Sequence, residues 1–123
     1  MTDHKTRCYL AGPMSGLPGF NFPAFHAAAA KLRAEGFYVF NPAEADIDRS
    51  GVDPSVLNPS GDPNGSTANI PGLSRRECLA ADLKWIAEEG EAIALLPGWE
   101  KSSGAKAEKA LADALNLQVI YLD

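Results

Sequence analysis

The sequence predicts an α/β fold: a small doubly wound parallel sheet, Rossmann-like or flavodoxin-like, with helices on both faces. Short apolar runs end at glycine, proline or asparagine, and segments whose apolar residues recur at helical spacing lie between them. Strand, helix and strand follow one another over so short a span that we expect parallel strands joined by a right-handed crossover. All 123 residues are expected to form one domain.

The first half of the chain predicts one strand–helix–strand unit. Residues 8–11 form a short apolar run closed by Gly12 and Pro13, and residues 37–40 form a second run that ends at Asn41. Between them, Pro23 opens a helix in its first turn, where its missing N–H costs nothing. The apolar residues of this helix recur at helical spacing: Phe25, Ala28, Ala29 and Leu32.

The second half predicts two further strands, each preceded by a helix. Ser74 and Glu77 have the spacing of a capping box, and the helix that follows is expected to end near Gly90. The apolar run 92–96 fits a central strand covered on both faces. A last helix is expected from about 104 to 116, with Leu111 and Leu115 facing the core, before a strand at 119–122.

The stretch 46–72 is crowded with proline, glycine, asparagine, aspartate and serine and shows no period. A loop of this length within a small domain is usually functional or disordered. We expect either a mobile segment, ordered by a ligand or a neighbouring subunit, or a tolerated surface insertion.

Charge and composition exclude several kinds of partner. The net charge is −5 and the longest basic run is Arg75-Arg76, which argues against binding duplex nucleic acid but leaves room for one small phosphorylated ligand. A short polar N-terminus and the absence of a long apolar run predict a cytoplasmic protein without membrane contact. Cys8 and Cys78 have no metal-ligand spacing with any histidine, so we expect two buried free thiols and no metal; we also expect no cofactor.

Three of the predicted loops follow strand ends and are expected at one edge of the sheet, where such folds bind ligands. Small residues in these loops offer backbone N–H groups and helix N-termini that suit a phosphate. The candidate binding residues are Gly12, Ser15, Gly16, Asn41, Ser102, Ser103 and Gly104. Neither a G-x-G-x-x-G nor a Walker A motif is present, and the same residues also simply make turns and helix caps.

Two carboxylates lie on apolar stripes of predicted helices. Glu108 shares its helical angle with Leu111 and Leu115, and Asp82 lies beside Leu79 and Leu83. A buried carboxylate is costly unless it is paired or functional, and a pair of them is what retaining glycosyl chemistry uses. The alternative is structural: Glu108 solvated at the sheet's rim or paired with an arginine, and Asp82 paired with Arg75 two turns earlier on the same helix.

Three aromatic residues are candidates to stack on a base. Trp99 lies in the loop before Ser102 and is the favoured ligand contact, whereas Trp85 fits the core better; Phe20 is the third candidate.

Several segments together resemble the nucleoside 2-deoxyribosyltransferase superfamily, which includes the 2′-deoxynucleoside 5′-phosphate N-hydrolases, with a phage-associated branch as the nearest match. The motifs are Tyr-Leu-Ala-Gly-Pro at 9–13, Asp-Leu-Lys-Trp-Ile at 82–86 and Ser-Ser-Gly-Ala-Lys-Ala-Glu at 102–108. The resemblance covers nearly the whole chain except 46–72. The first loop departs from it, because Gly-Pro-Met-Ser-Gly replaces the arginine-bearing version of the hydrolases.

The resemblance implies a role for each matching residue. Glu108 corresponds to the glutamate that attacks the anomeric carbon, and Asp82 to the aspartate that positions the sugar or handles the proton of the leaving base. Ser102 and Gly104 correspond to residues that hold the sugar's 5′ end or its phosphate. Gly12 and Ser15 fall in the first loop of the same pocket. A homo-oligomer is also implied.

The function expected from these observations is cleavage of an N-glycosidic bond, or deoxyribosyl transfer, on a deoxynucleoside or deoxynucleotide. Two alternatives remain at this point: a non-catalytic binding module for a nucleotide-derived ligand, and a relative that cleaves cytokinin-type nucleotides or NAD-like glycosides.

Overall fold

A computed structural model describes residues 4–62, 66–67 and 70–123. Four strands form a single sheet: β1 (Arg7–Ala11), β2 (Tyr38–Phe40), β3 (Ala92–Leu95) and β4 (Gln118–Tyr121). Four α-helices accompany them: α1 (Phe22–Ala34), α2 (Pro42–Ser50), α3 (Arg75–Glu89) and α4 (Ser103–Ala114). Short 3₁₀ turns span Pro18–Asn21, Pro54–Leu57 and Trp99–Lys101.

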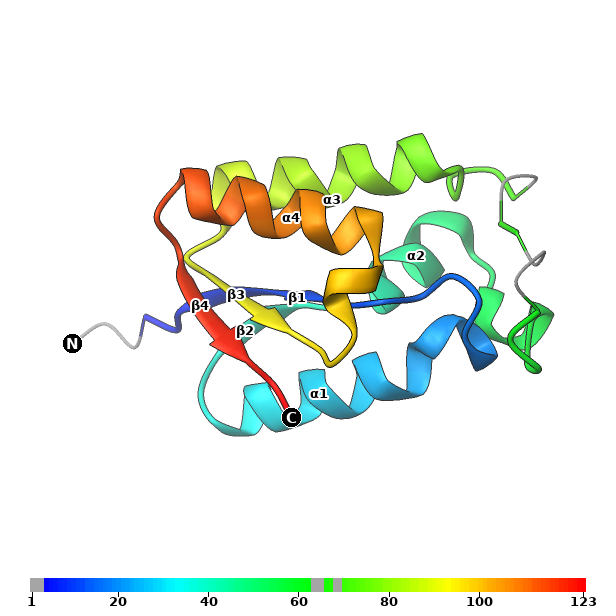
Figure 1. The fold of residues 1–123 in the computed structure, drawn as a ribbon, viewed down its shortest axis with the longest axis horizontal. Helices are drawn as coiled ribbons and strands as arrows, with labels where there is room; N and C mark the ends of the chain where they lie inside the picture. The colour runs from blue at the N-terminus through cyan, green and yellow to red at the C-terminus, as the bar shows by residue number, and fades with distance from the viewer. Residues whose placement is uncertain (1–3, 63–65, 68–69) are drawn as a thin grey trace.

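The sheet is entirely parallel, with strand order β2-β1-β3-β4, which confirms the predicted fold class (Figure 1). The order reverses between β1 and β3, because the chain builds outward from β1 first to β2 and then, on the other side, to β3 and β4. In folds of this kind, the crevice beyond the carboxyl ends of the strands at such a point is where ligands bind.

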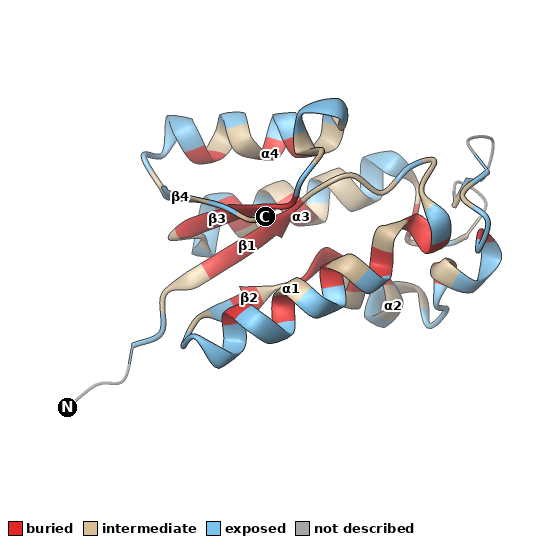
Figure 2. Ribbon diagram, turned by 60° about the horizontal axis from the view of Figure 1, so that its bottom comes forward, coloured by how far each residue is buried: buried red, intermediate tan, exposed pale blue. Residues whose placement is uncertain are grey.

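Alternating residues of β1 define the two apolar layers of the core. Cys8 and Leu10 pack on the side of α1, whereas Tyr9 and Ala11 pack with residues of α3 and α4 on the other side. The alternation follows from the two-residue period of a strand. Figure 2 shows the buried β1 and β3 between these helical layers. None of the helices in the described part of the chain is long and apolar enough to cross a membrane.

Local signals set most helix boundaries as predicted. Ser74 and Glu77 form the expected capping box of α3, and Ser102 caps α4 by accepting a hydrogen bond from the N–H of Ala105. The end of α4 differs from the expectation: the helix stops at Ala114, and Leu115, predicted to face the core, is 43% exposed. Once the helix ends, helical spacing no longer decides which way Leu115 faces.

Helix α2 was not predicted, and it occupies the start of the stretch 46–72. Asn41 caps it by accepting a hydrogen bond from the N–H of Ala43, Pro42 lies in its first turn, and Gly51 ends it with a φ of +75°. These are strong start and stop signals. The helix escaped prediction because the residues it buries are Pro42, Ala43 and Asp46, which make no apolar stripe.

Gly12 lies where β1 ends, against the residue that follows β3. A Cβ atom at position 12 would lie 2.7 Å from the Cβ and 2.9 Å from the Cδ1 of Leu96, which is itself buried. Glycine therefore permits the close approach of the two strand ends at the edge that faces the cavity described below.

We predict that Gly12→Ala destabilises the protein by about 1–3 kcal/mol, because the added methyl group overpacks the contact with Leu96. Chemical denaturation measures this. Gly104→Ala is the matched control, since a Cβ there meets nothing closer than 3.7 Å and alanine suits a helix. Equal stability of the two variants would contradict the prediction.

Candidate functional site

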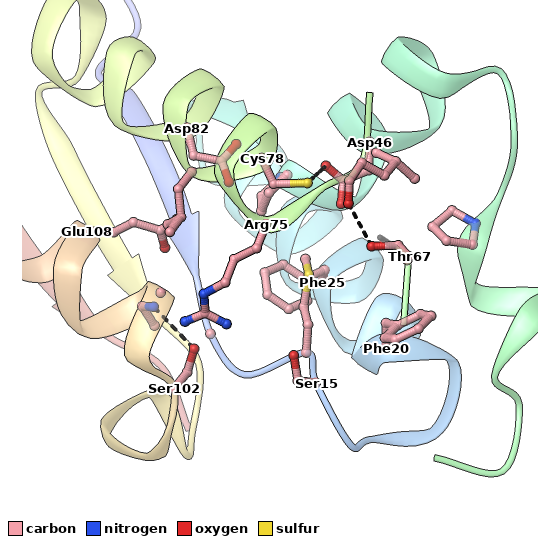
Figure 3. A pocket seen from close by; sticks show the side chains of 18 of the residues that line it. Ser15, Phe20, Phe25, Asp46, Thr67, Arg75, Cys78, Asp82, Ser102 and Glu108 are labelled. Carbon is pink, nitrogen blue, oxygen red and sulfur yellow. Dashed lines mark hydrogen bonds between the residues drawn. The ribbon is translucent and has the colours of Figure 1, made fainter. Parts of the chain in front are cut away.

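A cavity of about 320 Å³ opens beyond the carboxyl ends of β1 and β3 (Figure 3). This volume falls within the range of roughly 300–1,000 Å³ common for small-molecule sites. The first loop, α1, α2, α3 and α4 all contribute to its wall, together with residues from 54 to 73. The cavity therefore collects side chains from distant parts of the sequence at the place where the topology predicts a ligand.

Glu108 lies on the wall that α4 presents to the cavity and is 6% exposed. The helix places it on the same face as the buried Ala105 and Ala112. Its Oε2 accepts a hydrogen bond of 2.7 Å from the hydroxyl of Tyr9, which comes from the middle of β1. Burial next to carboxylates raises the pKa of Tyr9 well above its ordinary value, so the phenol keeps its proton and acts as a donor.

Asp82 of α3 is also 6% exposed and lines the same cavity. Among the described residues, its Oδ1 has no hydrogen-bond partner although it is buried. The alternative pairing with Arg75 is not formed: Arg75 instead donates from Nη2 to the hydroxyl of Ser103. A buried acceptor without a partner is costly. The Oδ1 atom of Asp82 is therefore available to accept a hydrogen bond inside the cavity.

Burial raises the pKa of both carboxyl groups, and the charge of Asp82 raises that of Glu108 further. Burial, and then the charge of Asp46, raise the pKa of Asp82 to about 7, opposed by its interaction with Tyr9. Burial, and then the charge of Asp82, raise the pKa of Glu108 to about 8, again opposed by Tyr9. Between these values the pair holds one proton and one negative charge, and its two titration steps belong to the pair rather than to either residue.

The structure brings six of the ten sequence-predicted site residues to the cavity: Glu108, Asp82, Gly12, Ser15, Ser102 and Gly104.

The other four lie outside its lining and have other contacts. Asn41 is buried, caps α2 and contacts His26. Trp99 packs on the apolar cluster beneath α4, with the Lys109 ammonium 5.8 Å from its ring centroid. Ser103 is exposed and bonded to Arg75, and Gly16 has a φ of +76° in the turn before α1. Of the other aromatic candidates, Phe20 lines the cavity, and Trp85 packs against Tyr9 and Phe40.

Sequence reasoning missed two residues of the site. Tyr9 lies within an apolar strand, where a tyrosine is an ordinary core residue, and nothing local shows that its hydroxyl reaches α4. Asp46 lies in the stretch that showed no period, and the signals that place it on a helix are the cap at Asn41 and Gly51.

The stretch 46–72 contributes directly to the cavity through Asp46, Pro54, Ser66 and Thr67. The stretch is therefore part of the cavity wall and not only a surface insertion. Its expected mobility stays a prediction, and residues 63–65 and 68–69 of the stretch lie outside the described residues.

Within the described ranges, no group of three or more histidine, cysteine, aspartate or glutamate side chains is arranged to hold a metal ion. Both cysteines are free thiols; Cys8 is buried in the core and Cys78 is half-buried at the cavity wall. Burial raises the pKa of Cys78 to about 11, which keeps it protonated and a poor nucleophile.

Fold and site together define a small parallel α/β protein with an acidic cavity at the reversal point of its sheet. The chain belongs to a family described as a domain of unknown function (DUF4406), whose model matches residues 6–121. No curated protein and no solved structure matches the chain significantly.

We predict that Glu108→Gln becomes more stable relative to the wild type as pH rises. A carboxyl whose pKa is raised in the folded protein binds its proton more tightly there than in the unfolded chain. The wild type therefore loses stability from about pH 4.5, the ordinary value, up to about 8. The glutamine variant lacks this loss at position 108.

Urea denaturation of both proteins at about pH 5 and pH 8 measures the effect, expected to be on the order of 2–4 kcal/mol. Glu88→Gln is the control, because Glu88 is exposed on α3. A difference between wild type and Glu108→Gln that stays constant with pH would show that Glu108 is not a buried, proton-holding group.

Proposed function

We propose that this protein cleaves the N-glycosidic bond of a deoxynucleoside or deoxynucleotide, or transfers its deoxyribosyl group, with Glu108 as the nucleophile. The observation that carries the proposal is the pair of buried carboxylates, Glu108 and Asp82, in one cavity beyond the sheet. Both residues lie in the motifs that resemble the nucleoside 2-deoxyribosyltransferase superfamily. From the same resemblance we expect a homo-oligomer, and we expect the protein in the cytoplasm.

The chemistry requires a group that stabilises positive charge at C1′. As the bond between C1′ and the base nitrogen breaks, its electron pair leaves with the base and the sugar becomes oxocarbenium-like. An oxygen of the Glu108 carboxylate then bonds to C1′ and forms a glycosyl ester. Water, or the nitrogen of a second base, attacks C1′ in turn and restores the free carboxylate.

The leaving base needs a proton, and we assign its delivery to Asp82. The pKa values, about 7 for Asp82 and about 8 for Glu108, place the proton of the pair on Glu108 before the reaction begins. Positive charge growing at C1′ next to Glu108 favours the Glu108 anion, and the hydrogen bond from Tyr9 supports that anion. The proton then resides on Asp82, from which it passes to the base nitrogen.

The remaining polar groups of the cavity fit the other end of such a ligand. Ser102 and Gly104 lie at the N-terminus of α4, and Arg75 at the N-terminus of α3 lines the same cavity. Backbone N–H groups, hydroxyls and a guanidinium suit a sugar hydroxyl or a phosphate.

A non-catalytic binding module is the second candidate. The observation that favours it is the raised pKa of Glu108, about 8, which leaves this carboxyl protonated at neutral pH, able to donate a hydrogen bond rather than attack. Ligand-induced thermal stabilisation by nucleosides or 5′-monophosphates, without release of free base, would favour this candidate.

We predict that the wild type releases free base from at least one member of a panel of deoxynucleosides and their 5′-monophosphates, and that Glu108→Gln abolishes the release. The variant keeps the shape of the cavity but has no carboxylate to attack C1′. Chromatography of the free base measures the rate. Mass spectrometry after incubation with a slow 2′-fluoro substrate is expected to find the sugar on Glu108.

Asp82→Asn is the matched comparison, and we expect it to slow the release less than Glu108→Gln does, because water can still protonate the base. Asp113→Asn, on the exposed side of α4, is the control for a charge change on the same helix. Full activity of a folded Glu108→Gln protein would refute the nucleophile assignment.

We also predict a bell-shaped dependence of kcat/KM on pH, with its maximum between about 7 and about 8. The rate requires one proton on the pair: it rises as the first carboxyl ionises and falls as the second does. Initial rates across the pH range measure it. In Asp82→Asn the falling limb is expected to disappear, and a flat profile in the wild type would contradict a shared proton.

A further inference from the structure

The cavity has two unlike sides, and the proposed chemistry uses one of them. Asp82, Glu108 and Ser102 belong to α3, α4 and its cap, whereas Asp46 and the rings of Phe20 and Phe25 lie across from Glu108 (Figure 3). Thr67 lies on this second side as well, and the apolar side chains of Pro54 and Leu73 also line the cavity. A flat heterocycle needs apolar walls of this kind together with a few polar groups that fix its orientation.

Asp46 is the charged group on this second side, and the protein holds it firmly. It is 8% exposed and lies on α2. Arg49, one turn later, donates from Nη2 to its Oδ1 at 2.9 Å, and the thiol of Cys78 lies 3.8 Å from the same oxygen. Arg49 is fixed in turn by a hydrogen bond of 2.6 Å from its Nε to the carbonyl oxygen of Gly72.

This arrangement leaves one carboxylate oxygen for a ligand. In the part of the chain that the structure describes, both contacts of the Asp46 carboxylate go to Oδ1, and the side chain lines the cavity. Burial raises the pKa of Asp46, and the ion pair with Arg49 opposes this by favouring the ionised form, which accepts hydrogen bonds and donates none. A group that binds Oδ2 must therefore present an N–H or O–H.

Asp46 is also near enough to the reacting pair to serve the same ligand. Its charge contributes to the raised pKa of both Asp82 and Glu108. Asp82, whose buried Oδ1 has no hydrogen-bond partner among the described residues, lies between Asp46 and Glu108 in Figure 3. A ligand whose sugar lies at Glu108 thus extends its base past Asp82 toward Asp46.

We propose that Asp46 is a specificity residue for the leaving base, and that it selects a heterocycle with an exocyclic amino group by accepting a hydrogen bond from that group at Oδ2. The inference rests on the proposed function for the orientation of the ligand. Its recognition step does not depend on catalysis, so the free base is expected to bind in the same place.

The test compares two substrates that differ by one amino group: 2′-deoxyadenosine and purine 2′-deoxyriboside, each as nucleoside and as 5′-monophosphate. We expect the ratio of their kcat/KM values to fall at least tenfold from wild type to Asp46→Asn. Adenine and purine differ as leaving groups even without Asp46. Comparing the kcat/KM ratio of the variant with that of the wild type cancels this intrinsic difference. Asp48→Asn, an exposed position on α2, is the matched control and is expected to keep the wild-type ratio.

Calorimetric binding of free adenine and free purine to the wild type forms the second arm. Adenine is expected to bind at least tenfold more tightly, and Asp46→Asn to remove that preference. If no substrate releases base but adenine is still preferred, the proposed function fails and the assignment of Asp46 stands. If Asp46→Asn does not fold, the relative affinity of the wild type for adenine and purine decides whether the proposal stands. Equal binding of adenine and purine, or an unchanged kcat/KM ratio in folded Asp46→Asn, would overturn the proposal.

Discussion

The hydrogen bond from Tyr9 to Glu108 joins the centre of the sheet to the helix that carries the proposed nucleophile. Burying a carboxylate is costly, and the cost is tolerable here because a phenol donates to it and because the pair with Asp82 retains a proton. Tyr9 is itself held by the rings of Phe40 and Trp85. The position of Glu108 therefore depends on packing that begins at β2, on the far side of β1.

The strand order explains why this carboxylate faces an open space instead of a packed core. At the reversal between β1 and β3, the connections leave toward opposite sides of the sheet, and the ends of these strands lack a common cover. Gly12 lets the two strand ends approach closely. Helix α2, together with Pro54, Ser66 and Thr67, forms another part of the cavity wall. The result is a cavity lined by Tyr9 of the sheet, by residues of the helices and by the less regular segment that follows α2.

Electrostatics gives this cavity its chemical character. Three carboxylates, Asp46, Asp82 and Glu108, face a volume of about 320 Å³, and each has a pKa raised by burial. Asp46 is compensated by Arg49, whereas Asp82 and Glu108 have no arginine in direct contact among the described residues. The site thus combines one neutralised acceptor with a pair that shares a proton, a division suited to recognition at one end and proton transfer at the other.

The sequence alone determined the parallel α/β class and the capping of α3, and it placed Glu108 and Asp82 on apolar stripes, because these features depend on local periodicity and caps; the burial of the two carboxylates came from the tertiary structure. It did not reveal α2, whose buried face is made of proline, alanine and aspartate instead of an apolar stripe. Tertiary structure alone decided that Tyr9 reaches Glu108, 99 residues away, and that Arg75 contacts Ser103 instead of Asp82. Such contacts depend on which elements the strand order brings together, and that order cannot be predicted from the local spacing of residues.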